Sequence, residues 1–195
     1  MPLPVHEQPL PYVSQLPLRA VTLIRRVVIH CTELPDLSTA RTYGERAHYD
    51  DGTGHSGHYY INRDGNCYCY VPGTRIAYHA RGYNTDSIGV ELVNRGRYPN
   101  WFDSRQQRMT EPYTNVQIAS LCAWLQQWRE EFPELRYISG HEDLDTERVQ
   151  ASDDPSQQVL RKCDPGALFP WDTVLASCQL ERFPRGEPNI DPNRS

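Results

Sequence analysis

Several side chains in this sequence could together hold a metal ion, although they lie far apart along the chain. His30 closes the apolar run RRVVIHCT, and His141 follows a second run, LRYISG. Near the C-terminal end, Cys163 and Asp164 stand side by side in RKCDPG, so either could supply a third ligand. Two histidines with one carboxylate or thiolate, and a fourth position open for water, form the ligand set of a catalytic zinc site. Residue types alone leave both third ligands possible, and each histidine alone also fits a structural role.

Glu91 is an anomaly within an apolar segment, SIGVELV. A strand alternates its side chains between two faces, which here gives Ile88, Val90 and Leu92 on one face and Ser87, Gly89 and Glu91 on the other. A carboxylate is costly to bury unless it is paired or used, and its small neighbours leave open space beside it. Glu91 is therefore either a functional carboxylate or a strand-edge glutamate facing water.

Four further histidines are weaker candidates for a functional site. His79 lies in RIAYHARGYNTDSIG and is another candidate for the site, whereas His58 in GHYYI is better explained by a hydrogen-bonded structural role. His48 and His55 lie in a loop rich in glycine and aspartate, where we expect surface residues.

The local patterns predict the elements that must position these side chains. β-Branched and alternating runs predict strands, the Asp64-Gly65 pair predicts a hairpin turn, and helical spacing of apolar residues predicts helices. The expected elements are a strand at 25–32, a loosely bounded helix at 37–50, a hairpin at 58–71, a strand at 86–93, a helix at 114–132 and a strand running into a loop at 135–143. Thr114 and Gln117 form a capping box for the longest helix. The mixture predicts an α/β (α+β) fold, a mixed sheet with helices packed on it.

The length of 195 residues suits one domain. We expect an extended N-terminal arm at 1–24, one domain at 25–180 and a disordered, polar tail at 181–195. No apolar run approaches the roughly 18 residues of a membrane helix. A formal net charge of −5, without clustered Lys and Arg, argues against nucleic-acid binding.

The cysteines and the N-terminus bear on the compartment. The six cysteines form no CxxC pair and predict reduced thiols, with Cys67 and Cys69 as buried apolar residues. The N-terminus has no basic segment followed by an apolar stretch, so no secretory signal is visible and a cytoplasmic protein is expected.

Taken in order, the motifs resemble one known family. VVIHCT, GHYYINRDGNCYCYVPGTRIAYHARGYNTDSIGVELVN, SGHEDLD and RKCDPGALFPW are similar, over roughly residues 25–178, to the zinc-dependent N-acetylmuramoyl-L-alanine amidases. These share their fold with peptidoglycan recognition proteins and with the phage lysozyme-type amidases. The branch that this chain resembles most is AmpD-like, the cell-wall-recycling amidases that act on 1,6-anhydro-muropeptides. The resemblance implies hydrolysis of the amide between N-acetylmuramic, or 1,6-anhydro-N-acetylmuramic, acid and L-alanine.

The resemblance also assigns a metal site. It implies that His30 and His141 are ligands of one zinc ion per chain. In the recycling branch the aspartate directly before Pro-Gly binds zinc, which corresponds here to Asp164, and Cys163 falls on a variable position.

Catalytic and substrate-binding roles follow from the same resemblance. Lys162 falls on the catalytic lysine and Glu91 on the catalytic glutamate, whereas the phage branch uses a tyrosine where this chain has Gly57. His79 and Asn84 match positions that line the substrate groove.

Two features shape the expected substrate. The loop 94–113 carries Tyr98, Trp101, Phe102 and several arginines, and we expect it to form a groove wall that meets sugars and stem-peptide carboxylates or, alternatively, an ordinary surface loop. The stretch 142–161 is longer than in compact family members, and we expect an extra loop or short helix there.

Three interpretations of the function therefore remain open at the level of the sequence. The first is a monomeric recycling enzyme acting on muropeptides. The alternatives are a non-catalytic peptidoglycan-binding module and a lytic amidase acting on the intact cell wall.

Overall fold

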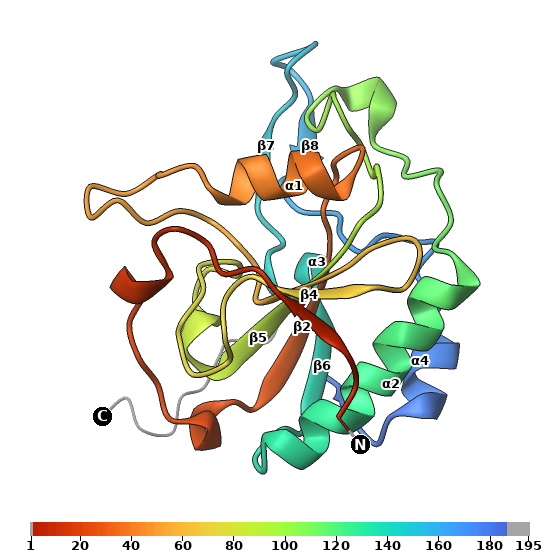
Figure 1. Ribbon diagram of the computed structural model, residues 1–195. Coiled ribbons are helices and arrows are strands. Elements are labelled where there is room, and N and C mark those ends of the chain that lie inside the picture. The colour runs from red at the N-terminus through yellow and green to blue at the C-terminus, as the bar shows by residue number, and fades with distance from the viewer. Residues whose placement is uncertain (1, 187–195) are drawn as a thin grey trace.

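A mixed β-sheet forms the centre of the computed structural model, which describes residues 2–186 (Figure 1). Within these residues the sheet has seven strands in the order β1-β4-β3-β5-β2-β6-β9. Their bounds are β1 Val5–Glu7, β2 Arg26–Cys31, β3 Tyr59–Ile61, β4 Cys67–Cys69, β5 Ser87–Leu92, β6 Tyr137–Gly140 and β9 Glu181–Arg182. The central strands β3, β5, β2 and β6 run parallel, and β4 pairs antiparallel with β3 as the predicted hairpin. The predicted α/β class with a mixed sheet is confirmed.

Helices cover both faces of this sheet. They are α1 Leu37–Gly44, α2 Asn115–Glu131, α3 His141–Leu144 and α4 Trp171–Ser177, with single 3-10 turns η1 Val13–Gln15, η2 Val21–Leu23, η3 Asn84–Asp86 and η4 Ser104–Gln106. The main core lies between the sheet and α2 with α4, and it contains the fully buried Ile88, Val90 and Leu92 of β5. A second cluster packs α1 against the opposite face. The predicted alternation along β5 therefore holds, and it directs Glu91 away from the main core.

The long helix α2 begins as the sequence predicts, with one difference. The hydroxyl of Thr114 accepts a hydrogen bond from the backbone N–H of Gln117 (3.1 Å). The side chain of Gln117 does not return to the cap; it donates to the carbonyls of Ile61 (2.9 Å) and Val93 (3.1 Å). Gln117 thereby ties α2 to the sheet instead of completing the capping box.

The N-terminal arm is extended and adds an edge strand to the sheet. β1 pairs in parallel with β4, and Leu10, Tyr12 and Leu16 are buried in the cluster beneath α1. Arg19 is 8 % exposed and donates to the carbonyls of Gly73 (2.8 Å) and Ser87 (2.7 Å), among others. The arm is therefore packed into the domain.

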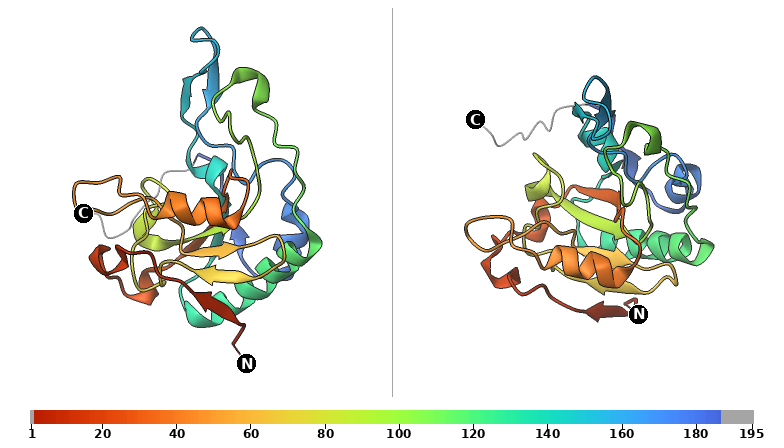
Figure 2. Two further views of the ribbon diagram at one scale, coloured as in Figure 1. Left: turned by 45° about the horizontal axis from the view of Figure 1, so that its top comes forward. Right: turned by 90° about the horizontal axis from the view of Figure 1, so that it is seen from above.

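The stretch 142–161 holds more structure than predicted. His141 begins the short helix α3 in place of the expected loop, and an antiparallel hairpin follows, β7 Arg148–Gln150 and β8 Gln158–Leu160. The hairpin projects beyond the sheet beside the loop that follows β5 (Figures 1 and 2). Each of its strands has only three residues, too few for an alternating pattern to be recognised in the sequence.

The C-terminal region differs from the predicted tail at its start. Glu181 and Arg182 form β9, which pairs with Tyr137 and Ile138 of β6, and residues 187–195 lie outside the described part of the chain. All six cysteines are free thiols, as expected. Among residues 2–186, no helix is both long and apolar enough to cross a bilayer.

Candidate active site

The parallel order of the central strands brings the candidate residues to one edge of the sheet. His30 lies near the carboxyl end of β2, Glu91 near that of β5, and His141 directly follows β6. Carboxyl ends of parallel strands share an edge, and ligand sites form in the crevice outside it. Asp164 reaches the same place from the segment that follows β8, so residues separated by more than half the chain become neighbours.

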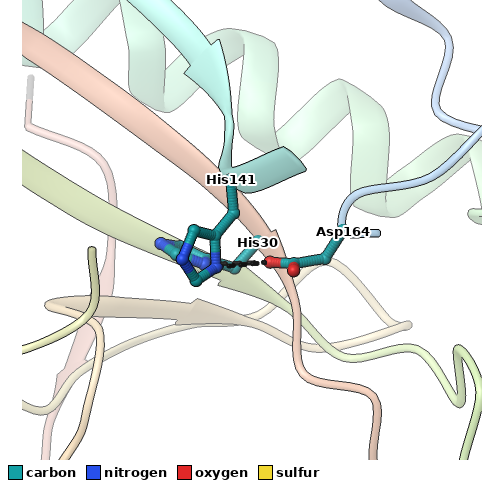
Figure 3. A group of neighbouring side chains, drawn as sticks. All are labelled: His30, His141 and Asp164. Atoms are coloured by element: carbon teal, nitrogen blue, oxygen red, sulfur yellow. Dashed lines mark hydrogen bonds and ion pairs between the residues drawn. The ribbon is translucent and has the colours of Figure 1, made fainter. Parts of the chain in front are cut away.

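His30, His141 and Asp164 converge within bonding reach of one small centre. Figure 3 shows both imidazoles directed at the carboxylate of Asp164, whose Oδ2 lies 3.0 Å from Nδ1 of His30 and 3.2 Å from Nδ1 of His141. One ligand atom from each residue lies within 4.8 Å of the others. Each residue is only 3 % exposed, so the cluster is built into the fold.

Their ionisation states suit a metal site. Burial lowers the pKa of His141, which favours the neutral imidazole. Burial acts to raise the pKa of Asp164, but the neighbouring imidazoles of His141 and His30 outweigh it and hold the pKa well below its usual range. Neutral imidazole and ionised carboxylate are the metal-binding forms.

The remaining carboxylate oxygen gives an independent test of the fit. Oδ1 of Asp164 is buried and has no hydrogen-bond partner among the described residues. A buried polar atom without a partner is unusual and calls for an ion or a water. Two imidazole nitrogens next to a buried carboxylate with one oxygen unpartnered fit a divalent cation such as zinc.

Cys163 does not take part in this cluster. The group of possible ligands found in residues 2–186 contains Asp164 and not its neighbour. The Cys163 side chain is half-buried, and burial raises the pKa of its thiol, which disfavours the thiolate needed for metal binding.

His79 lies directly behind His30. Its Nδ1 is 3.0 Å from Nε2 of His30, and its Nε2 is 3.2 Å from the hydroxyl of Ser87, which donates to the carbonyl of Tyr83 (2.6 Å). If Nδ1 of His30 binds a metal, its Nε2 carries the proton and donates to His79. Such a partner fixes the orientation of a ligating imidazole. His79 also lines the groove, so both roles are open to it.

Asn84 and Gly89 hold His79 in place. The side-chain oxygen of Asn84 accepts hydrogen bonds from the backbone N–H groups of His79 (3.0 Å) and Ala80 (2.8 Å). A Cβ on Gly89 would lie 2.6 Å from the His79 ring. Asn84 lines the groove, but its side-chain oxygen is already used as the acceptor of these two backbone hydrogen bonds.

Glu91 faces the groove from the strand next to His30. The two residues are register partners in the parallel pair β2–β5, so their side chains share a face. Burial raises the pKa of the Glu91 carboxyl above its ordinary value, and its carboxylate accepts no hydrogen bond from the residues described here. A carboxylate with these properties is suited to accept a proton from a bound reactant.

Gly57 gives Glu91 its space. A Cβ at position 57 would lie 2.7 Å from Cγ of Glu91, a distance that carbon atoms do not tolerate. A tyrosine at 57 and a glutamate at 91 in this conformation therefore exclude one another.

A groove of about 620 Å³ runs over the cluster. Its lining includes Glu91 and Lys162 together with the aromatic residues Tyr43, Tyr49, Tyr78, Trp101 and Phe102. Tyr98 is not part of this lining and packs edge-to-face on Trp101, with ring centroids 5.7 Å apart. Of the three aromatic residues expected in the groove wall, Trp101 and Phe102 line the groove, whereas Tyr98 packs on Trp101 outside the lining.

The other histidines divide between core and groove. His58 is fully buried; its Nδ1 accepts from the backbone N–H of Gly89 and its Nε2 donates to the carbonyl of Arg75, each at 3.0 Å. The predicted structural role of His58 is confirmed. His48 and His55 are exposed as expected, and they also line the groove rim.

Glu33 and Arg97 were not predicted as part of the site. Both are buried in the lining of the groove and are joined by a bidentate ion pair. Neither residue lies in a segment with a helix or strand pattern. The sequence offered one weak signal, that Arg97 is one of several arginines in the loop 94–113.

Sequence comparisons relate this chain to known proteins. The family model described as N-acetylmuramoyl-L-alanine amidase matches residues 20–167. N-acetylmuramoyl-L-alanine amidase AmiD of Escherichia coli (strain K12) is 34 % identical over 112 residues, which are 53 % of this chain and 35 % of that protein. The 1,6-anhydro-N-acetylmuramyl-L-alanine amidase AmpD of Enterobacter cloacae is 30 % identical over 125 residues, 60 % of this chain and 53 % of the relative.

Solved structures agree on the fold. The amidase LysC from Clostridium intestinale URNW superposes with a TM-score of 0.65 at 20 % identity, covering 92 % of this chain and all of the other. AmiD from E. coli was solved in complex with anhydro-N-acetylmuramic acid-L-Ala-D-gamma-Glu-L-Lys. It superposes with a TM-score of 0.59 at 24 % identity, and the match covers 80 % of this chain and 57 % of the AmiD chain. The chain thus spans about a third of AmiD and about half of AmpD in sequence.

Proposed function

Since the chain belongs to the N-acetylmuramoyl-L-alanine amidase family, we propose that it hydrolyses the amide between N-acetylmuramic acid, or its 1,6-anhydro form, and L-alanine. One observation carries the proposal: the His30, His141 and Asp164 cluster, Glu91 and Lys162 all meet on a single groove.

His30, His141 and Asp164 would hold one zinc ion. Bound there, zinc supplies a Lewis acid that polarises an amide carbonyl and activates water for attack. A set of three protein ligands is typical of catalytic rather than structural zinc sites. The burial of all three ligands and the unpartnered Oδ1 of Asp164 support this assignment.

Glu91 would move the proton. It accepts a proton from the attacking water and gives it to the leaving amine of L-alanine, so the amine departs neutral. Its free carboxylate and raised pKa suit a group that must both take up and release a proton. It lies beside His30 in the sheet and lines the same groove, where the substrate would bind.

Lys162 would stabilise the oxyanion. The lysine lines the groove two residues before Asp164, and its ammonium provides a positive charge where the tetrahedral intermediate becomes negative. A single such donor typically contributes about 3–4 kcal/mol to transition-state stabilisation.

The walls of the groove would bind the substrate. Trp101 and Phe102 offer aromatic rings suited to sugars, and the exposed guanidinium of Arg81 suits a carboxylate of a stem peptide. Arg161 also lines the groove, but Asp145 and Glu147 already pair with its guanidinium. Arg97, in the predicted wall loop, is not available for this role because Glu33 occupies its guanidinium.

A non-catalytic peptidoglycan-binding module is the main alternative. Such a module has no need of a complete ligand set, a free carboxylate and a lysine on one groove, so the observed combination favours an enzyme. The names of AmiD and AmpD refer to amidase activity, with the 1,6-anhydro sugar in the name of AmpD.

Digestion experiments test the proposal and its substrate. The purified protein, loaded with zinc, is incubated separately with anhydro-muropeptides and with intact sacculi, and products are identified by mass spectrometry. Free stem peptides beginning with L-alanine are expected from the anhydro-muropeptides. Release from sacculi as well would indicate a lytic amidase, and no release from either substrate would contradict the proposed activity.

A further inference from the structure

Arg97 is a buried arginine whose hydrogen-bonding capacity is completely used. It is 3 % exposed and lies in the loop after β5. All five N–H donors of its guanidinium have acceptors: Glu33 Oε1 (2.7 Å from Nε), Glu33 Oε2 (2.8 Å) and the carbonyl of Arg161 (3.3 Å) from Nη2, and Gln107 Oε1 and the carbonyl of Leu160 (both 3.1 Å) from Nη1. A guanidinium with every donor satisfied is fixed in position and orientation.

The first partner is joined to the strand of His30. Glu33 stands two residues beyond the end of β2, is 7 % exposed and has a left-handed backbone with φ of 49°. A Cβ on Gly96 would lie 2.6 Å from Cγ of Glu33, and the backbone N–H of Arg97 also donates to Oε1 (3.1 Å). The local backbone on both sides is therefore shaped to bring this carboxylate to Arg97.

The second set of partners is joined to Asp164. The carbonyls of Leu160 and Arg161 belong to the residues directly before Lys162. Arg97 thus links the chain just after one candidate metal ligand to the chain just before another, and the proposed oxyanion donor lies between them. Because Leu160 ends β8, the same side chain also connects the base of the β7–β8 hairpin to the residue Glu33 that follows β2.

We propose that Arg97 is a positioning residue that sets the Lys162–Asp164 segment in register with the β2 strand of His30. The proposal rests on the metal-site part of the proposed function, and it goes beyond that function because Arg97 acts through other residues. The long hairpin insertion is then anchored at its base, directly next to the groove, by one saturated side chain.

Lysine cannot replace Arg97 in this role. Its ammonium is a compact charge with three donors. The planar guanidinium of arginine has five donors and can hydrogen-bond to a carboxylate and to separate carbonyls at the same time. An Arg97→Lys variant keeps the charge opposite Glu33 and loses the simultaneous contacts to Gln107, Leu160 and Arg161.

Metal binding without substrate tests the proposal. The metal-free full chain of wild type and of Arg97→Lys is titrated with Co²⁺, and zinc affinity is measured by competition with a chelator. We expect zinc affinity to fall by about 10- to 100-fold and the visible Co²⁺ absorption spectrum to change. The turnover number should fall more than KM changes, because the groove itself remains.

Arg105→Lys serves as the matched control. Arg105 lies in the same loop, but its side chain is 73 % exposed and pairs with Asp103. Its replacement should leave zinc affinity and the Co²⁺ spectrum unchanged. If Arg97→Lys folds and also matches wild type in both measurements, the proposal is wrong.

A second variant covers the case in which Arg97→Lys does not fold. Glu33→Gln keeps the size of the partner and removes its charge, and the same loss of zinc affinity is expected. Failure of both variants to fold would assign the pair to overall stability and overturn the proposal. If wild type binds zinc but does not cleave muropeptides, the proposed function fails and the role of Arg97 in metal binding is still decided by these measurements.

Discussion

His30 and Glu91 are register partners on the neighbouring parallel strands β2 and β5, so backbone pairing alone places a candidate metal ligand beside a candidate base. Neither side chain needs the other to hold its position. Glu91 depends instead on Gly57, and His30 on His79 and Asp164. Metal binding and proton transfer should therefore be separable by mutation.

Replacing Asp164 should remove the metal. Asp164→Ala deletes the oxygen that lies 3.0 Å from His30 and 3.2 Å from His141, so elemental analysis should find less than one zinc per chain and amidase activity should be lost. Cys163→Ser is the control and should keep both zinc and activity. A zinc-free serine variant together with a zinc-loaded alanine variant would reverse the assignment of the third ligand.

Replacing Glu91 should stop turnover while leaving metal bound. Glu91→Gln preserves shape but cannot accept a proton, and the turnover number should fall by about 100-fold or more at unchanged zinc content. Near-normal turnover would remove Glu91 as the base.

The pH dependence of the wild type follows from the pKa of Glu91. The group must be ionised to act as a base, and burial raises its pKa above the ordinary value of 4.5. Activity should therefore decline, as the pH falls, at a higher pH than a solvent-exposed glutamate would give. The acid limb of kcat/KM against pH measures this, and a limb at or below the ordinary value would contradict it.

A single methyl group at position 57 should disturb Glu91. In Gly57→Ala the new Cβ would lie 2.7 Å from Cγ of Glu91, so we expect loss of turnover with zinc retained. The double variant Gly57→Ala/Glu91→Gln should be scarcely worse than Glu91→Gln, because the two changes act on one group. Independent, multiplicative losses would show that the glycine matters for another reason.

His79 should matter for metal affinity more than for substrate affinity. His79→Leu removes the partner of Nε2 of His30, and zinc affinity should weaken by about 10- to 100-fold. His79→Gln offers an oxygen in a similar place and should restore part of the affinity. A change confined to KM, with zinc affinity intact, would instead favour the groove-lining role.

The N-terminal arm, residues 1–24, should contribute to stability although the family match covers only its last residues, beginning at residue 20. Arg19→Ala leaves the buried carbonyls of Gly73 and Ser87 without their donor, which typically costs about 1–3 kcal/mol. Urea unfolding measures this, with the exposed Arg46→Ala as a control expected to change little. Equal stability of the two variants would mean that water replaces the lost contacts.

The sequence was sufficient for the elements whose patterns are local. The strands around His30 and Glu91, the hairpin at Asp64-Gly65 and the helix after Thr114 follow from side-chain alternation, turn chemistry and capping, all of which act over a few residues. Residue types made His30 and His141 candidate zinc ligands, with either Cys163 or Asp164 as the third. The family resemblance then favoured Asp164 and suggested Glu91 as the base.

Only the tertiary structure decided what depends on contacts between distant segments. Four features involve residues that no short-range pattern connects. They are the fully hydrogen-bonded guanidinium of Arg97, the contact of His79 with His30, the packing of Tyr98 on Trp101 and the β7–β8 hairpin. Local propensity acts along the chain, whereas a buried donor is satisfied by whichever acceptor the fold brings near, and that acceptor is known only when the chain has folded.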